Sequence, residues 1–229
     1  MKHSPVPLAQ IYSYTKSMNT FGLNTTQKLA RARADLRMGA PVVIVGTSAS
    51  LVYSAEVIDQ SRFDNLREHF NDARLVIAAR RAETLKVACY DGDFAQIAIS
   101  NDSDLRWVKS VADPSRDLST GPLGPFQVLR DTTIGQERAA LSLLKSAELL
   151  PAAVLCEIKN PAEFANKNEL SLLHSSDIAA SVESHPHFVD MIAARLPTQN
   201  SDQGRLHVFR PPPADQEHYA LEIGRPDRT

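Results

Sequence analysis

Short apolar runs alternate with amphipathic helical patterns through most of the chain. In the helical patterns apolar residues recur every three or four positions, as in the segments 26–38 and 139–150. The runs between them are rich in valine, isoleucine and leucine and predict buried strands at 41–45, 51–58, 74–79, 94–100, 152–158 and 170–173. This alternation predicts an α/β fold in which helices are layered on a mixed β-sheet.

The end of the chain has a different pattern. Two strand-like segments, 204–210 and 217–224, flank the proline-rich stretch 211–216, and this arrangement predicts a β-hairpin. The first 25 residues are polar and lack a clear period, which predicts a flexible leader. We therefore expect three parts: the leader 1–25, an α/β domain at 26–196, and the start of a truncated second domain at 197–229.

Composition narrows the class of protein without naming a function. Of the 229 residues, 43% are hydrophobic and 23% are charged, and the formal net charge is −2. This balance predicts a globular protein and excludes the basic surface that nucleic-acid binding requires. No apolar run approaches the length of a membrane span. The two cysteines, Cys89 and Cys156, lack metal-type spacing, so we expect a reduced, cytoplasmic setting.

Two blocks in the second half of the chain carry a family resemblance. Residues 151–158 read PAAVLCEI, and residues 164–170 read FANKNEL. In order they closely resemble the P-A-x-V-x-C-E-[IL] and F-A-N-K-H-N-[ML] blocks of the 3,4-dihydroxy-2-butanone 4-phosphate synthases, riboflavin-pathway enzymes that act on ribulose 5-phosphate. The resemblance implies the α/β fold of that family. Because synthases of this family pair as dimers, it also implies a homodimer.

The chain departs from the family at the groups that the family's chemistry uses. The acidic loop D-D-E-D-R-E-N-E-G-D-L, which binds a divalent cation and transfers protons in the synthases, is replaced by Gly46-Thr47-Ser48-Ala49-Ser50. We expect this segment to be a tight polar connection between strands, with phosphate binding by its backbone as the alternative. The phosphate-holding D-R-x-x-T pattern is missing as well. Gln136 stands where the synthases have a metal-binding histidine, and a neutral amide does not replace imidazole as a strong ligand.

Two residues remain as site candidates. Glu157, at the end of the 152–158 strand, is the recognisable remnant of the family's site and a vestigial catalytic candidate; alternatively, it is the first polar residue beyond the core. Arg106 is a candidate for binding an anionic substrate; alternatively, it is a solvated helix residue next to a core-facing Trp107. His185 and His187 flank a proline, and we expect a surface turn there rather than a metal site.

The last strands resemble the opening of GTP cyclohydrolase II. In that family G-x-F-x-x-x-x-F-R and E-H-x-A-L-x-x-G precede the catalytic body, and here the segments read GRLHVFR and EHYALEIG. The resemblance implies a cyclohydrolase domain in cis, whose zinc-binding cysteines and GTP pocket lie outside this chain.

These resemblances predict a riboflavin-biosynthesis protein whose synthase-like domain is catalytically silent and acts as a scaffold or dimerisation module for GTP cyclohydrolase II. No cofactor is expected in this chain, Mg²⁺ belonging to active synthases and Zn²⁺ to the cyclohydrolase part. The alternative is an active synthase with a rearranged Mg²⁺ site, since carboxylates suit Mg²⁺; its ligands would come from Glu56, Asp59, Asp91, Asp93 and Glu157. A further alternative is regulatory binding of a flavin or a nucleotide.

Overall fold

The chain forms two compact units, Met1–Ala179 and Ala180–Thr229, which we describe separately. The computed structural model describes residues 21–90, 92–130, 135–183, 189–197, 199, 204–210 and 217–224. Several predicted features fall outside these residues: most of the leader, Asp91, the turn at 185–187 and the hairpin connection at 211–216.

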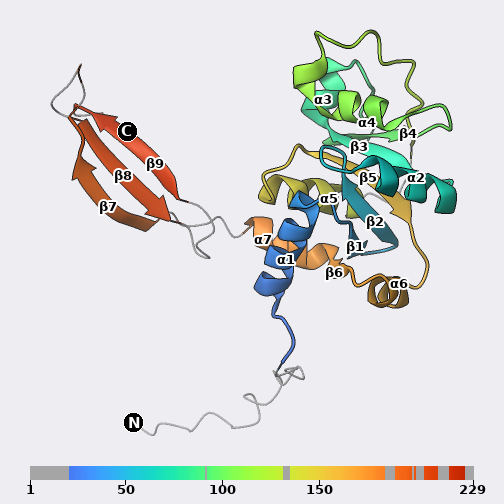
Figure 1. The fold of residues 1–229 in the computed structure, drawn as a ribbon, viewed down its shortest axis with the longest axis horizontal. Coiled ribbons are helices and arrows are strands. Elements are labelled where there is room, and N and C mark those ends of the chain that lie inside the picture. Colours follow the sequence, from blue (N-terminus) through green and yellow to red (C-terminus); the bar gives the residue numbers. More distant parts are fainter. Residues whose placement is uncertain are drawn as a thin grey trace, which may run out of the picture. The chain divides into compact units, whose positions relative to one another are not determined.

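A six-stranded sheet is the centre of the first unit (Figure 1). Its strand order is β4-β3-β5-β2-β1-β6, and all neighbours are antiparallel except β1 and β6, which are parallel. The mixed α/β sheet predicted from the apolar runs is therefore confirmed. The strands are β1 Val42–Val45, β2 Ala49–Ser54, β3 Arg74–Ala78, β4 Phe94–Ala98, β5 Ala152–Glu157 and β6 Ser171–His174.

Helices cover both faces of this sheet. On one face α1, α5 and α7 pack apolar side chains such as Leu36, Leu144 and Ile178 into a buried cluster. On the other face α2, α3, α4 and α6 contribute, with Phe63 and Val108 among the buried residues. The helices are α1 Thr25–Arg37, α2 Gln60–His69, α3 Ala79–Thr84, α4 Leu105–Ala112, α5 Gly135–Ser146, α6 Pro161–Lys167 and α7 Ser175–Glu183, with a 3-10 turn, η2, at Pro114–Arg116. None of the described helices has the length and apolar character needed to cross a membrane.

Helix ends follow the local chemistry of the sequence. Asn24, rather than Thr25 or Thr26, caps α1: its side-chain oxygen accepts the Gln27 N–H at 2.9 Å, and the Gln27 side chain accepts the Asn24 N–H at 3.0 Å. Gly39 follows α1 with φ of 77°, in the left-handed region that an end-of-helix glycine favours. The helical segment predicted at 26–38 is thus correct to within one residue at each end.

The second unit contains a three-stranded antiparallel sheet in the order β7-β8-β9. Its strands are β7 Val189–Arg195, β8 Gly204–Arg210 and β9 His218–Ile223. The predicted hairpin is present as β8 and β9. The sequence pattern places the domain boundary at 196/197, whereas the compact units divide after Ala179, because β7 pairs with β8. The apolar pattern of β7 alone does not predict this pairing.

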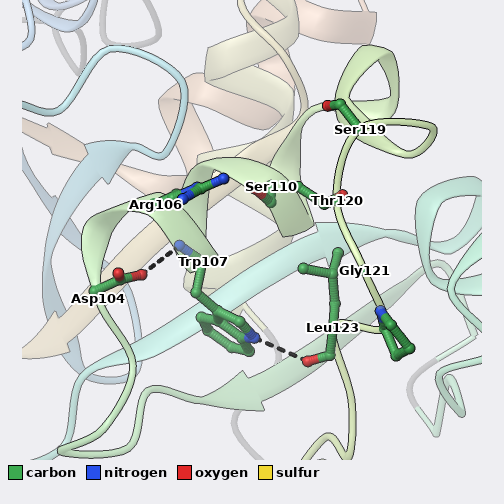
Figure 2. Close-up of a pocket in the computed structure, with 9 residues that line it drawn as sticks. Asp104, Arg106, Trp107, Ser110, Ser119, Thr120, Gly121 and Leu123 are labelled. Carbon is green, nitrogen blue, oxygen red and sulfur yellow. Dashed lines mark hydrogen bonds between the residues drawn. The ribbon is translucent and has the colours of Figure 1, made fainter.

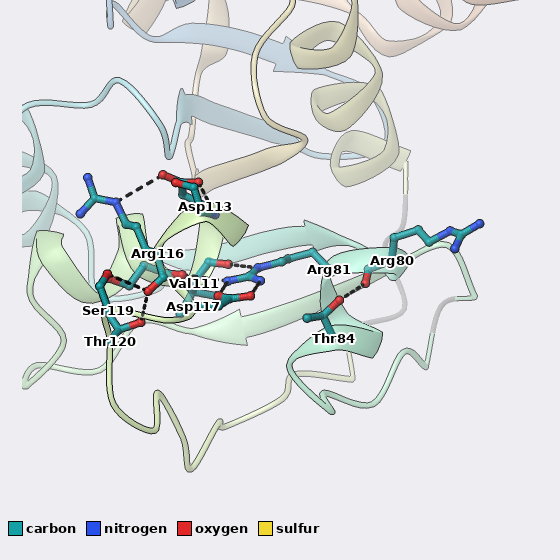
Figure 3. A network of polar contacts seen from close by, with 11 residues as sticks. Arg80, Arg81, Thr84, Val111, Asp113, Arg116, Asp117, Ser119 and Thr120 are labelled. Carbon is teal, nitrogen blue, oxygen red and sulfur yellow. Dashed lines mark hydrogen bonds and ion pairs between the residues drawn. The ribbon is translucent and has the colours of Figure 1, made fainter.

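A buried arginine ties three segments of the first unit together (Figure 3). Arg81, in α3, is only 7% exposed. It donates hydrogen bonds to the carbonyl oxygens of Val111 at 2.7 Å and Ser110 at 2.9 Å, at the end of α4. Its guanidinium also binds both carboxylate oxygens of Asp117, at 2.6 and 2.7 Å, just beyond η2. This arrangement fixes the segment after α4 against the sheet.

We predict that Arg81→Ala lowers the free energy of unfolding by about 2–4 kcal/mol, because the two carbonyls and the Asp117 carboxylate lose a desolvated cation. The hydrogen bond from Arg81 holds the pKa of Asp117 below its ordinary value, so the pair stabilises the fold above about pH 4 and loses that effect as the pH falls through the lowered pKa. Chemical denaturation at pH 7 and pH 3 measures both effects. The neighbouring Arg80→Ala, at an exposed position in the same helix, is the matched control and should change little; equal losses from the two variants would contradict the prediction.

Candidate functional site

One edge of the six-stranded sheet gathers the segments that the sequence singled out. The register pairs Val45 with both Ala49 and His174, and it pairs Ser50 with Glu157. The turn between β1 and β2, the end of β5 and the start of α7 therefore meet at this edge. Gln136, in the first turn of α5, reaches the same place through its contact with Ser48.

The β1–β2 turn is packed against two side chains from distant segments. The Gly46 N–H donates to the Ser48 carbonyl at 2.8 Å, and this bond closes a tight turn. The Gln136 amide nitrogen donates to the same Ser48 oxygen at 2.6 Å. A Cβ placed on Gly46 would lie 2.9 Å from Ser175 Oγ and 3.2 Å from Gln136 Nε2, so a side chain here would require both neighbours to move. The predicted tight polar connection is confirmed, and the Gln136 side chain stabilises it by its hydrogen bond to Ser48.

A buried ion pair lies beside Gln136 under the start of α5. Arg74 Nη2 donates to Glu137 Oε1 at 2.7 Å, and the two side chains are 11% and 1% exposed. Among the described residues, six buried side-chain atoms have no hydrogen-bond partner: Ser50 Oγ, Arg74 Nε, Gln96 Nε2 and Oε1, Gln136 Oε1 and Glu137 Oε2. They belong to five polar residues of the first unit, of which Arg74 and Glu137 are bonded to each other. Removing one partner of such a pair is strongly destabilising because the other charge stays buried.

The buried pair of Arg74 and Glu137 could not be predicted from the sequence, for a physical reason. The helical pattern suggested that α5 begins near Ala139, whereas it begins at Gly135 and so turns Gln136 and Glu137 inward. In the sequence, Arg74 is the polar first residue of the apolar segment predicted as a strand at 74–79. An arginine at such a position together with a Gln-Glu pair at a helix start was the available signal, but only the tertiary fold brings the two together.

Glu157 occupies the same edge but is exposed to solvent. Its backbone N–H donates to Asp72 Oδ2 at 2.8 Å, which brings a second exposed carboxylate to the end of β5. Asp72 was not anticipated from the sequence. The preceding residue, Cys156, is fully buried, and burial, reinforced by the charge of Asp72, raises the pKa of its thiol to about 12. Cys156 is therefore an inert core residue rather than a nucleophile.

The carboxylates of the alternative metal site do not gather around Glu157. Glu56 accepts the Leu150 N–H at 2.7 Å, just before β5. Asp93 precedes β4, and both carboxylates therefore lie at the edge of the sheet opposite to Glu157. Glu157 ends β5, roughly 17 Å away along a six-residue strand. Asp93 is held by two Arg138 nitrogens at 2.7 and 2.8 Å, and this hydrogen-bonded arginine lowers its pKa.

The remaining carboxylates of this set are Asp59 and Asp91. Asp59 caps α2 by accepting the Arg62 N–H at 2.8 Å, and Asp91 lies outside the described residues. Within the described part of the chain, no three His, Cys, Asp or Glu side chains cluster closely enough to hold a metal ion.

Arg106 lines an open groove on the outer side of α4 (Figure 2). The groove, of about 240 Å³, lies between α4 and residues 119–123. Trp107 forms part of its wall and donates its indole N–H to the Leu123 carbonyl at 3.0 Å. Arg106 itself is exposed, as the solvated-helix interpretation expects, and no ion pair or hydrogen bond links it to Glu157 among the described residues. A cavity of this size is below the ~300–1,000 Å³ typical of sites for drug-sized ligands, which argues against a buried flavin or nucleotide here.

Comparisons with known proteins give the chain its relatives. No family model matches it. GTP cyclohydrolase-2 of Azospirillum brasilense is 27% identical over 208 residues, covering 86% of this chain and 53% of that protein. GTP cyclohydrolase-2 of Xylella fastidiosa is 24% identical, covering 90% and 50%. Riboflavin biosynthesis protein RibBA of Mycobacteroides abscessus is 32% identical over 106 residues, covering 39% and 24%. The chain thus spans about half the length of the two cyclohydrolase-2 relatives.

Solved structures show the same fold. RibBX, a two-domain 3,4-dihydroxy-2-butanone 4-phosphate synthase from A. baumannii, superposes with a TM-score of 0.54 at 18% identity, covering 86% of this chain and 70% of that one. A cation-free 3,4-dihydroxy-2-butanone 4-phosphate synthase gives 0.53 at 16% identity, covering 68% and 96%. At such identities the likeness shows the fold alone, and it is the fold that the sequence blocks predicted.

We predict that Gly46→Ala destabilises the first unit by about 1–2 kcal/mol, because the new methyl group meets Ser175 Oγ and the Gln136 amide. The control is Gly121→Ala, since a Cβ there has no neighbour within 4 Å. Thermal unfolding of both variants measures the difference. Adding Ser175→Ala should recover part of the loss, because it removes the nearer of the two contacts. A neutral Gly46→Ala would show that the turn is not packed as described.

Proposed function

We propose that the first unit of this chain, a 3,4-dihydroxy-2-butanone 4-phosphate synthase-like domain in a relative of riboflavin-biosynthesis proteins, is a catalytically silent scaffold. The observation that carries the proposal is the contact of Gln136 with the β1–β2 turn. The turn and Gln136 stand where the synthases carry their acidic loop and metal-binding histidine, and here they are bonded to each other instead.

The residues at this edge do not fit a Mg²⁺ site of the synthase type. Mg²⁺ requires near-octahedral oxygen ligation and binds proteins through carboxylates and waters. Gly46 offers no acidic side chain and little room for one, and the Gln136 amide nitrogen faces the Ser48 oxygen. Asp72 and Glu157 supply the carboxylates near the end of β5 from exposed positions. We therefore derive no catalytic step through a metal ion.

The second requirement of the synthase reaction, several groups held together around the substrate, is also unmet. A skeletal rearrangement of a sugar phosphate needs several groups held in one geometry, and effective molarities fall steeply when even one is misplaced. Arg106, the anion-binding candidate, lies on a groove formed by α4 and residues 119–123 rather than beside Glu157. A lone carboxylate at the sheet edge is left without a metal or a phosphate anchor.

What remains intact is the packed domain, and this supports the scaffold role. Both faces of the sheet are covered by helices, and the interior is filled by large apolar side chains such as Phe63, Phe94 and Leu144. We infer that this body serves as a homodimerisation module for a GTP cyclohydrolase II that the second unit begins, in the cytoplasm. Two observations support this: the matches to the cyclohydrolase-2 relatives extend beyond the first unit, and the synthases that the domain resembles pair as dimers.

The first test is direct. We predict that the purified chain with Mg²⁺ releases no formate from ribulose 5-phosphate above the background of a heat-treated sample, because the turn and Gln136 supply no metal ligand. A formate assay with an active synthase as positive control measures this. Turnover that disappears in Glu157→Gln but survives in Glu56→Gln would establish the alternative, an active synthase with a rearranged site.

The second test addresses the scaffold. We expect sedimentation velocity at micromolar concentration to give a species of twice the 25.2 kDa chain mass, and we expect Ile192→Glu in the second unit not to dissociate it, because the first unit holds the interface. A monomer at these concentrations would contradict the dimerisation module while leaving catalytic silence untouched.

A further inference from the structure

The three-stranded sheet of the second unit is sharply two-faced. Its pairing register places Leu206 beside Ala194 and Leu221, and Val208 beside Ile192 and Tyr219. Because side chains alternate along a strand and stay in register across it, these residues share one face. The apolar face consists of Ile192, Ala194, Leu206, Val208, Tyr219, Leu221 and Ile223.

The opposite face is polar. Arg205 lies across from Arg195 and Glu222, and His207 lies across from Ala193 and Ala220. His207 and Glu222 are joined by a 2.8 Å contact between Nε2 and Oε2. Phe209, stacked on His207, also lies on this face, but the charged and imidazole side chains make it the more polar of the two.

The apolar face is nevertheless open. Ile192 and Tyr219 are each 62% exposed, Ile223 is 58% exposed and Leu221 is 49% exposed. Antiparallel sheets that are apolar on one face commonly bury that face against the core of a domain. The face therefore marks a missing layer rather than ordinary scattered surface residues.

We propose that this apolar face is one half of the core of a cyclohydrolase-2-like domain, and that its occupant is the cyclohydrolase-2-like polypeptide that lies outside the region matched in the two relatives. The inference rests on the proposed function in one respect, the cyclohydrolase partner. It adds the surface by which that partner docks.

The relatives supply the first argument for this occupant. The match to the A. brasilense protein covers 86% of this chain, which is more than the first unit, ending at Ala179, makes up. The match to the X. fastidiosa protein covers 90%. Both matches therefore continue into the second unit, and about half the length of each relative lies outside its match.

The size of the face supplies the second argument, because it decides against a second copy of the chain. Three strands about 4.8 Å apart and about 20 Å long present roughly 300 Å². A stable interface between separate proteins buries roughly 800 Å² on each partner. A layer in the same polypeptide needs no such area, because it loses far less translational and rotational freedom on docking.

Cysteine labelling across two adjacent residues of β9 tests the proposal. Leu221→Cys places a thiol on the apolar face, and Ala220→Cys places one on the polar face, at positions that are both exposed. Each variant is made in the chain alone and in the chain extended by the part of the A. brasilense protein that lies outside its match. Peptide-level mass spectrometry of iodoacetamide labelling then separates these thiols from Cys89 and Cys156.

We expect both thiols to react alike in the chain alone, and we expect the thiol at 221, but not at 220, to react at least tenfold more slowly in the extended protein. An unchanged rate at 221, or equal protection at 220, would overturn the proposal. So would protection of 221 in the chain alone that grows with protein concentration, since a second copy would then be the occupant. None of these outcomes depends on formate release, so failure here is distinguishable from failure of the proposed function.

A second pair of variants guards against a misfolded fusion. Ile192→Glu and Arg195→Glu place the same side chain on opposite faces of β7. The melting temperature of the extended protein should fall with Ile192→Glu and stay unchanged with Arg195→Glu, and the chain alone should show no such difference. Equal effects of the two variants would count against the docking face.

Discussion

The hydrogen bond from the Gln136 amide to the Ser48 carbonyl fixes the turn that the first unit places at one edge of its sheet. It joins the first turn of α5 to the β1–β2 turn, and Gly46 and Ser175 complete the contact. A histidine or a carboxylate here would need space and water; an amide and a glycine need neither. At this edge, where the sequence aligns with the active-site region of the synthases, the side chains pack against one another. On this physical basis we propose a scaffold.

Two buried arginines show how distant segments of the domain are held together. Arg74 meets Glu137 under α5, and Arg81 joins α3 to the end of α4 and to Asp117. Buried ion pairs contribute little net stability compared with apolar residues of the same volume, but they are costly to break singly. They therefore fix which segments pack together. The unpartnered atoms around Arg74 mark the place where the interior is polar rather than closely complementary.

The sequence predicted the fold well because its signals are local. The strand of Ala152–Glu157 is a continuous apolar run, and Asp59 precedes a helical period that carries Phe63 and Leu66, as observed. The site was harder, because contacts over long sequence separations build it. Gln136 was recognised as a substitution, yet its bond to Ser48 spans 88 residues. Likewise, only the tertiary fold brings Asp72 to Glu157 and Arg74 to Glu137.

The two units differ in how far each is complete, and this has a consequence for stability. In the first unit helices cover both faces of the sheet, and each face has its own cluster of buried apolar side chains. In the second unit the apolar side of β7, β8 and β9 faces outward, and the interactions of one layer alone hold the sheet. Free energies of local opening follow buried apolar contact, so the second sheet should open at lower cost than the first. A partner that binds only the folded sheet shifts that balance by mass action, and linkage in one polypeptide makes its effective concentration high. We therefore infer that the first unit folds on its own core, and that the folding of the short sheet is coupled to the layer we propose for its apolar face.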